Sequence, residues 1–146
     1  MDQISKKIKM ISEKLKELKN KFNLYKIDGY VVPKNDEYFS EFAKKDKLKT
    51  ITGFDGSFGI AIILKKKNFL FVDGRYVEQA KIQAGKKFKI LEIPKKLPYQ
   101  ILNSRLNLGF DPKVFTSRNL IYFFRNKTKL TPINKTIINS DILKNR

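Results

Sequence analysis

The 146-residue chain contains no cysteine and no histidine. Without cysteine it can form neither a disulfide framework nor a thiol nucleophile. Zinc sites are nearly excluded as well, because their ligands are mostly histidine and cysteine. The nucleophile pairs Ser–His and Cys–His are excluded outright. Only chemistry carried by carboxylates, lysine, tyrosine or serine is therefore open to this sequence.

Long apolar runs are also missing. The chain has no stretch of about 18 apolar residues, the length that a membrane-spanning helix needs. Its basic, amphipathic N-terminus lacks the continuous apolar segment of a signal peptide. The absence of cysteine is typical of proteins in a reducing compartment. We therefore expect a soluble, cytoplasmic protein that does not associate with a membrane.

Arginine is scarce although the chain is strongly basic. Its net charge is +18, yet only five of its 32 basic residues are arginines. A basic chain raises the expectation of nucleic-acid or acidic-membrane binding, but nucleic-acid readers usually use arginine for bidentate contacts. Lysine, isoleucine and asparagine are abundant together, a mixture typical of an AT-rich genome. We therefore expect no nucleic-acid partner, and any function of the charge is left open.

What is present suffices for one compact domain over residues 1–146. Hydrophobic residues make up 41% of the chain and aromatic residues 12%, which is enough for a packed core. No internal repeat and no low-complexity linker interrupts the sequence. One domain of ordinary size is the expectation.

The apolar periodicity predicts alternating helices and strands. Residues 3–24 are predicted to form one helix, whose apolar stripe we expect to pack on a sheet; a coiled coil or a membrane-surface helix is the alternative. Strands are predicted at 30–32, 60–64, 69–72, 88–93 and 106–110, with weaker ones at 129–133 and 137–138. Shorter helices are predicted at 37–43, 75–84, 97–102 and about 117–125, with residues 44–49 as a charged link. This order indicates an α/β fold, a mixed parallel and antiparallel sheet flanked by helices.

A glycine-rich segment, Gly53-Phe54-Asp55-Gly56-Ser57-Phe58-Gly59, precedes the second predicted strand. It does not match the phosphate-binding loop, and it does not match the dinucleotide fingerprint because a strand follows it. Its backbone N–H groups could still form an anion-binding nest. We favour a tight turn in which glycines supply positive φ.

Two groups of charged residues could carry chemistry. Asp36, Glu37 and Glu41 lie within six residues of one another and could act as an acid–base or metal site, although such residues also favour the first turn of a helix. We favour the helix reading. Arg75, in the segment Asp73-Gly74-Arg75-Tyr76, could bind a carboxylate of a ligand, or it could pair with Asp55 or Asp73 to lock two turns. Both possibilities stay open.

Five blocks in order resemble the N-terminal domain shared by creatinase, prolidase and Xaa-Pro aminopeptidases. They are Asp28-Gly29-Tyr30-Val31-Val32-Pro33; Asn35-Asp36-Glu37 with Ser40-Glu41-Phe42; Ile51-Thr52-Gly53-Phe54-Asp55-Gly56-Ser57 with Gly59; Val72-Asp73-Gly74-Arg75-Tyr76 with Gln79-Ala80; and Leu108-Gly109-Phe110-Asp111-Pro112. The resemblance runs from about Leu15 to Ile138. One departure is Tyr38, which stands where relatives often carry a histidine.

The resemblance implies a creatinase N-terminal-domain-like fold with a ribonuclease H-like motif. It is strongest for the three-domain, cytosolic aminopeptidase P branch, whose members release the N-terminal residue from peptides with proline second. It further implies two divalent metal ions, usually manganese, held by two Asp, one His and two Glu in a C-terminal pita-bread domain. None of these ligands can be mapped onto this chain. The catalytic domain is therefore expected to lie outside these residues.

The resemblance also implies a role in substrate access and subunit association. The candidates for contact with the catalytic domain, a partner subunit or the substrate path are Asp36, Phe54, Arg75 and Tyr76. No catalytic or metal-binding residue is assigned, and the chain alone is expected to be inactive. The expected partners are its own catalytic domain, a second copy in a homodimer and the peptide substrates of the parent enzyme. The alternatives are a stand-alone protein- or polyanion-binding module and, last, an enzyme using carboxylates near Asp36 and Glu41.

Overall fold

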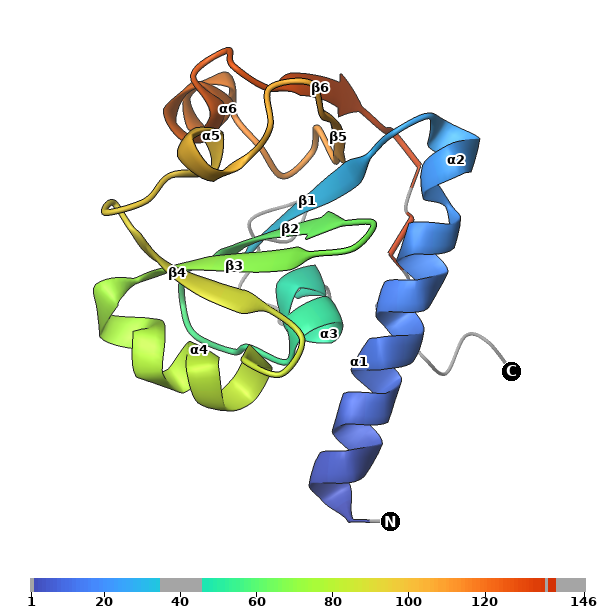
Figure 1. The fold of residues 1–146 in the computed structure, drawn as a ribbon, viewed down its shortest axis with the longest axis vertical. Coiled ribbons are helices and arrows are strands. Elements are labelled where there is room, and N and C mark those ends of the chain that lie inside the picture. Colours follow the sequence, from blue (N-terminus) through green and yellow to red (C-terminus); the bar gives the residue numbers. More distant parts are fainter. Residues whose placement is uncertain (1, 35–45, 136, 139–146) are drawn as a thin grey trace.

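A six-stranded sheet with helices on both faces forms the centre of the molecule (Figure 1). The structure, a computed structural model, describes residues 2–34, 46–135, 137 and 138. The strands are β1 (Gly29–Pro33), β2 (Ile60–Leu64), β3 (Asn68–Asp73), β4 (Lys89–Ile93), β5 (Asn107–Phe110) and β6 (Lys129–Pro132). The helices are α1 (Gln3–Asn20), α2 (Phe22–Tyr25), α3 (Lys47–Thr52), the 3-10 turn η2 (Gly74–Tyr76), α4 (Val77–Ala84), α5 (Pro98–Ile101) and α6 (Ser117–Phe124).

The sheet mixes parallel and antiparallel pairs in the order β4-β3-β2-β1-β5-β6. The hairpin of β2 and β3 is antiparallel, and β2 also pairs antiparallel with β1. The remaining neighbours, β3 with β4, β1 with β5 and β5 with β6, are parallel and need crossover connections. This arrangement confirms the predicted α/β fold with a mixed sheet.

Alternating side chains of the central strands enter two separate cores. In β2, Ala61 and Ile63 face the core that α1, α3 and α4 cover, whereas Ile60 and Ile62 face the core beside α5 and α6. Because both faces are covered, the central strands are near-continuous apolar runs rather than alternating ones. In Figure 1 the first group of helices lies beside and below the sheet, and α5 and α6 lie above it.

The N-terminal helix is largely as predicted. Its stripe packs on the sheet, and Leu15, Leu18 and Phe22 are buried. The predicted single helix is divided at Lys21, whose N–H donates to the carbonyl of Leu18, 3.0 Å away, so the last turn of α1 tightens. The stripe also begins earlier than the core does, because Ile4 is 71% exposed.

Two sequence predictions are wrong. Residues 47–49, predicted as part of a charged link, begin α3, which Asp46 caps by accepting the N–H of Lys49 at 3.1 Å. Only two of the six residues of α3, Leu48 and Ile51, show an apolar period, too few to reveal a helix. Ile137 and Ile138 form no strand and instead bury their side chains in the core under α1.

Other predictions lie outside the described residues. These are the helix predicted at 37–43 and the candidate residue Asp36. Among the residues that the structure does describe, no helix combines the length and apolar character needed to cross a membrane.

Candidate functional site

The turn of residues 53–59 contains Phe54, one of the predicted site residues, and packs against Tyr76, another of them. Gly53 ends α3 with a φ of 83°, so the expected positive φ is confirmed there. Its N–H donates to the carbonyl of Lys49 at 2.8 Å. The next two N–H groups are also used, that of Phe54 by Thr52 Oγ1 at 2.9 Å and that of Asp55 by Gln83 Oε1 at 3.2 Å. These three donors are therefore not available to an anion.

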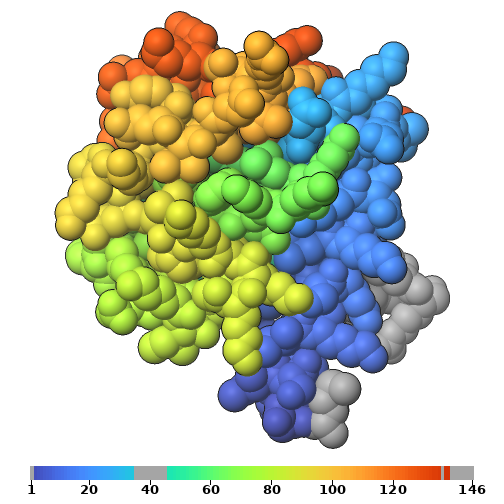
Figure 2. Space-filling model, in the orientation of Figure 1, coloured from blue at the N-terminus to red at the C-terminus, as the bar shows by residue number. Residues whose placement is uncertain are grey.

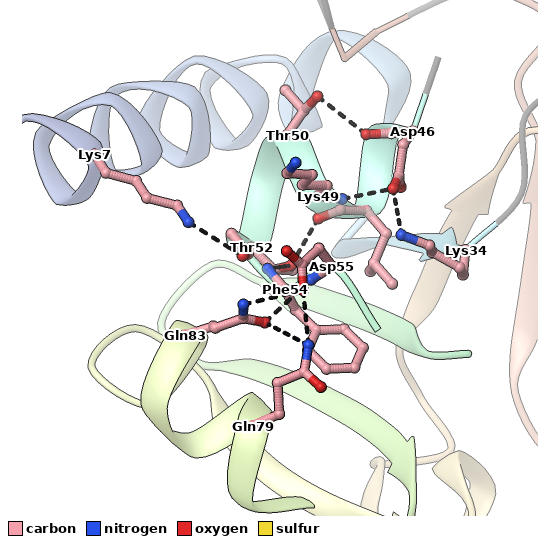
Figure 3. A network of polar contacts seen from close by, with 12 residues as sticks. Lys7, Lys34, Asp46, Lys49, Thr50, Thr52, Phe54, Asp55, Gln79 and Gln83 are labelled. Carbon is pink, nitrogen blue, oxygen red and sulfur yellow. Dashed lines mark hydrogen bonds and ion pairs between the residues drawn. The ribbon is translucent and has the colours of Figure 1, made fainter. Parts of the chain in front are cut away.

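Asp55 attaches the turn to α4 (Figure 3). Its Oδ1 accepts hydrogen bonds from Gln79 Nε2 at 2.7 Å and from Gln83 Nε2 at 3.0 Å. The hydrogen bond from Gln83 is the main reason that the pKa of this carboxyl lies below its usual range; the bond from Gln79 and the positive charges of Lys49 and Lys7 lower it further. Asp55 is thus a structural acceptor and not the partner of Arg75.

Phe54 is fully buried beneath the turn. Its ring lies edge-on to that of Tyr76, with 6.1 Å between the centroids and 77° between the planes. A Cβ atom at Gly56 would lie 2.2 Å from Phe54 Cζ, so the turn can close over the ring only because Gly56 has no side chain. Phe54 therefore holds the turn in place, and its own side chain is not on the surface.

Arg75 is the exposed member of the predicted site. Its Nε lies 3.1 Å from Asp73 Oδ1, which also accepts the backbone N–H of Arg75 at 2.9 Å. That backbone hydrogen bond is the main cause of a lowered pKa at Asp73. Of the two carboxylates considered for Arg75, Asp73 is the partner. The guanidinium carbon lies 5.3 Å from the centre of the Tyr76 ring, and 73% of the Arg75 side chain stays accessible.

Three exposed apolar residues, one in this turn and two on α6, were not selected from the sequence. Phe58, Ile121 and Tyr122 are 39%, 54% and 43% exposed. The ring of Phe58 lies 6.5 Å from that of Phe123, and Tyr122 packs edge-on against Phe123 at 5.1 Å. The available signal was the run Tyr122-Phe123-Phe124, because three consecutive helical residues cannot all face one core. We call the exposed side chains of Arg75, Phe58, Ile121 and Tyr122, together with the half-buried Tyr76, the turn–helix surface.

The described residues do not fit a metal centre. Across residues 2–34, 46–135, 137 and 138, no group of three or more His, Cys, Asp or Glu side chains could hold a metal ion. Asp55 and Asp73 each accept several hydrogen bonds from protein groups instead. The arrangement is that of a fixed turn presenting a mixed aromatic and arginine surface.

Comparison with known proteins identifies the domain. A sequence model of the creatinase/prolidase N-terminal domain matches residues 14–139. The chain belongs to this family. A probable Xaa-Pro aminopeptidase P from Coprinopsis cinerea is 31% identical over an alignment of 137 positions, which covers 85% of this chain and 22% of the fungal protein. Another from Laccaria bicolor is 41% identical over 83 residues, 56% of this chain and 13% of that protein.

Solved structures confirm the fold. X-prolyl aminopeptidase from Caenorhabditis elegans, described as a cytosolic enzyme with a di-nuclear active site, matches with a TM-score of 0.72 and 22% identity over 88% of this chain and 25% of its own. The N-terminal domain of the cytoplasmic peptidase PepQ from Mycobacterium tuberculosis matches with a TM-score of 0.68 and 21% identity, over 86% of this chain and 95% of that domain.

The matches place this chain among the N-terminal domains of the aminopeptidase P and prolidase family. It spans less than a quarter of the length of the two fungal relatives. The larger peptidases of the family contain a catalytic domain besides this one. The comparisons give no support to the alternative of a stand-alone binding module.

Proposed function

We propose that this chain is the non-catalytic N-terminal domain of a cytoplasmic Xaa-Pro aminopeptidase, an enzyme that releases the N-terminal residue before proline. The observation that carries the proposal is the match to Xaa-Pro aminopeptidase P over 137 residues. The proposal places the metal centre in another domain, because the described residues offer no group of side chains that could hold a metal ion. A chain with neither histidine nor cysteine also lacks the usual general bases and nucleophiles of peptidases.

The chemistry of the parent enzyme belongs, in this proposal, to another domain. The C. elegans relative has a di-nuclear active site, and two metal ions, which we take to be manganese, would supply the activated water that attacks the peptide bond. The residues of the present domain would contribute positioning and exclusion. They would narrow the mouth of the active site so that only short peptides enter.

The turn–helix surface is the proposed contact with the catalytic domain or with a second subunit. Exposed aromatic side chains and arginine are enriched at protein interfaces, and this surface includes Phe58, Tyr122 and Arg75. Asp73 and the Tyr76 ring hold the guanidinium in one orientation, so little side-chain entropy is lost when it binds a carboxylate. Asp36 stays a candidate for the same contact.

The reading frame that follows Arg146 tests the proposed parent enzyme. A frame that encodes two Asp, one His and two Glu at the spacing of a pita-bread metal site is the expected result. A stop codon directly after Arg146 would overturn the assignment to a peptidase, because the described residues hold no catalytic constellation.

Substitutions in the longer enzyme test the proposed surface. Phe58→Ser with Tyr122→Ser should lower the discrimination between short and long Xaa-Pro peptides or dissociate the dimer, while turnover of the shortest substrate stays within about twofold. The matched control is Leu24→Ser, which removes an apolar side chain that is 74% exposed on α2. An unchanged length preference and an unchanged oligomeric state would remove the turn–helix surface from the proposal.

A further inference from the structure

An apolar groove lies between two parts of the chain. One wall is the N-terminal part of α1, and the other is the C-terminal end of α4 together with the loop that follows α4. The groove encloses about 240 Å³. Its lining residues are Ile4, Lys7, Ile8, Ile11, Thr52, Ile82, Gln83, Ala84, Lys86 and Lys87. Figure 2 shows the first turns of α1, in dark blue, projecting below the body of the domain beside the yellow-green segment after α4. Four of the groove's ten lining residues, Ile4, Lys7, Ile8 and Ile11, precede the family match, which begins at residue 14.

The exposed isoleucines of the groove are not needed for the core. Ile82 is 85% exposed and Ile4 is 71% exposed, so burial within this chain does not explain either side chain. Ile11 follows Ile4 and Ile8 along the same apolar stripe of α1, and its side chain is buried where it lines the groove. The apolar stripe of α1 thus continues past the sheet by two turns, and a second apolar wall from α4 faces it. Such a concave apolar surface accepts inserted side chains.

Lysines surround the apolar lining. Lys7, Lys86 and Lys87 belong to the groove, and within the part of the chain that the structure describes no carboxylate pairs with Lys86 or Lys87. Lys19 lies close enough to Lys87 that, after burial, the charge of Lys87 is the second cause of its lowered pKa. Lys86 and Lys87 therefore add positive charge at this opening, whereas the charge of Lys7 also acts on the Asp55 carboxylate. A ligand with carboxylates would relieve that repulsion.

We propose that this groove docks an acidic peptide segment of a partner protein. One or two aliphatic or aromatic side chains of the segment enter between Ile4 and Ile82, and flanking Asp or Glu residues face the lysines. A second copy of this chain does not fit, because the contact would set lysines against lysines in a chain of net charge +18. A lipid surface fits less well, since the apolar residues line a hollow and a membrane needs a protruding apolar face.

Fluorescence anisotropy with the full chain tests the proposal. The probe is a labelled peptide whose leucines recur at spacings of three and four and whose other positions are glutamate. Ile4→Ser and Ile82→Ser should each weaken binding about tenfold, as expected for one lost apolar anchor. Lys86→Glu with Lys87→Glu should weaken it further and reduce its salt dependence. These side chains are exposed, so the fold is expected to persist, and circular dichroism checks it.

Two control variants distinguish binding in the groove from nonspecific attraction of the acidic peptide to a chain of net charge +18. Leu24→Ser removes an isoleucine-sized side chain that is 74% exposed elsewhere, and Lys66→Glu reverses a charge in the exposed β2–β3 turn; both should change binding less than about twofold. Equal losses in controls and groove variants, or no loss in the isoleucine variants, would overturn the proposal. So would binding of anionic phosphatidylserine vesicles that depends on Ile4 and Ile82 while the peptide does not bind.

Discussion

The edge of the Tyr76 ring meets the buried ring of Phe54, with 6.1 Å between the ring centroids. The hydroxyl of Tyr76 also forms a hydrogen bond with Ser57 Oγ at 2.5 Å. The Tyr76 side chain therefore contacts the turn of residues 53–59 at two residues, Phe54 and Ser57. The main chain beside it, at Arg75, is fixed by Asp73. Tyr76 therefore couples the start of α4 to the turn and sets where Arg75 is presented.

The hydrogen bond between Ser57 and Tyr76 should contribute little free energy because it is exposed. Tyr76→Phe and Ser57→Ala are each expected to lower the free energy of unfolding by about 0.5 kcal/mol. The double variant should lose no more than one single variant, because both remove the same bond. Urea denaturation of the four proteins measures this cycle, and additive losses would show that the two hydroxyls act independently.

Gly56→Ala should destabilise the domain through steric overlap. The new Cβ would lie 2.2 Å from Phe54 Cζ, and the fully buried ring has no room to move away. The expected loss is about 1–3 kcal/mol, the usual cost of overpacking. Thermal and urea unfolding measure it.

A relief variant identifies the cause. Phe54→Leu shortens the side chain under the turn, so Gly56→Ala should cost less in that background than in the wild-type chain. An equal cost in both backgrounds would contradict the contact between Gly56 and the Phe54 ring.

The pH dependence of stability should report the Asp55 carboxylate. Its pKa is lowered in the folded state, chiefly by the Gln83 hydrogen bond. The resulting stabilisation is complete above the unfolded pKa of about 3.9 and is lost as the pH falls through the lower, folded value. Asp55→Asn should therefore be less stable than the wild-type chain at neutral pH, and the difference should shrink as the pH falls through the lowered pKa of the folded state.

The control for this prediction is Glu78, which lies on α4, the helix that carries Gln79 and Gln83. Among the residues that the structure describes, Glu78 forms an ion pair with the exposed Lys81, at 3.8 Å, and its side chain is 87% exposed. Glu78→Gln should leave both the stability and its pH dependence close to those of the wild-type chain. A stability difference for Asp55→Asn that stays constant from neutral to acid pH would contradict the role given to the charge.

Much of the fold could be predicted from the sequence because both faces of the sheet are buried. The apolar runs of β1, β2 and β3 stand out, and the amphipathic stripe of α1 has a clear helical period. The short helix α3 could not be recognised, since its capping residue Asp46 and its two buried apolar side chains, Leu48 and Ile51, lie within a lysine-rich stretch. Local sequence patterns do not reveal a conformation that is set by tertiary contacts. Ile137 and Ile138 are an example, because they pack in the core under α1 without pairing as a strand.

The candidate site was predictable in part. The sequence identified the motif around Arg75 and Tyr76 but left two carboxylates as possible partners of Arg75. In the structure Arg75 pairs with Asp73 and not with Asp55. The sequence could not show that Phe54 is buried, because a glycine-rich turn usually exposes its aromatic residues. It also could not bring Phe58 next to α6, since 65 residues separate Phe58 from Phe123 and only the fold joins them.

The central claim is that this domain has no peptidase activity of its own. The most direct measurement is the release of the N-terminal residue from an Xaa-Pro peptide by the purified, folded chain with added manganese, beside an active Xaa-Pro aminopeptidase as reference. The account predicts no release above that of manganese alone. Robust turnover that is lost on Asp36→Asn or Glu41→Gln would contradict it, because those carboxylates would then carry catalysis within this domain.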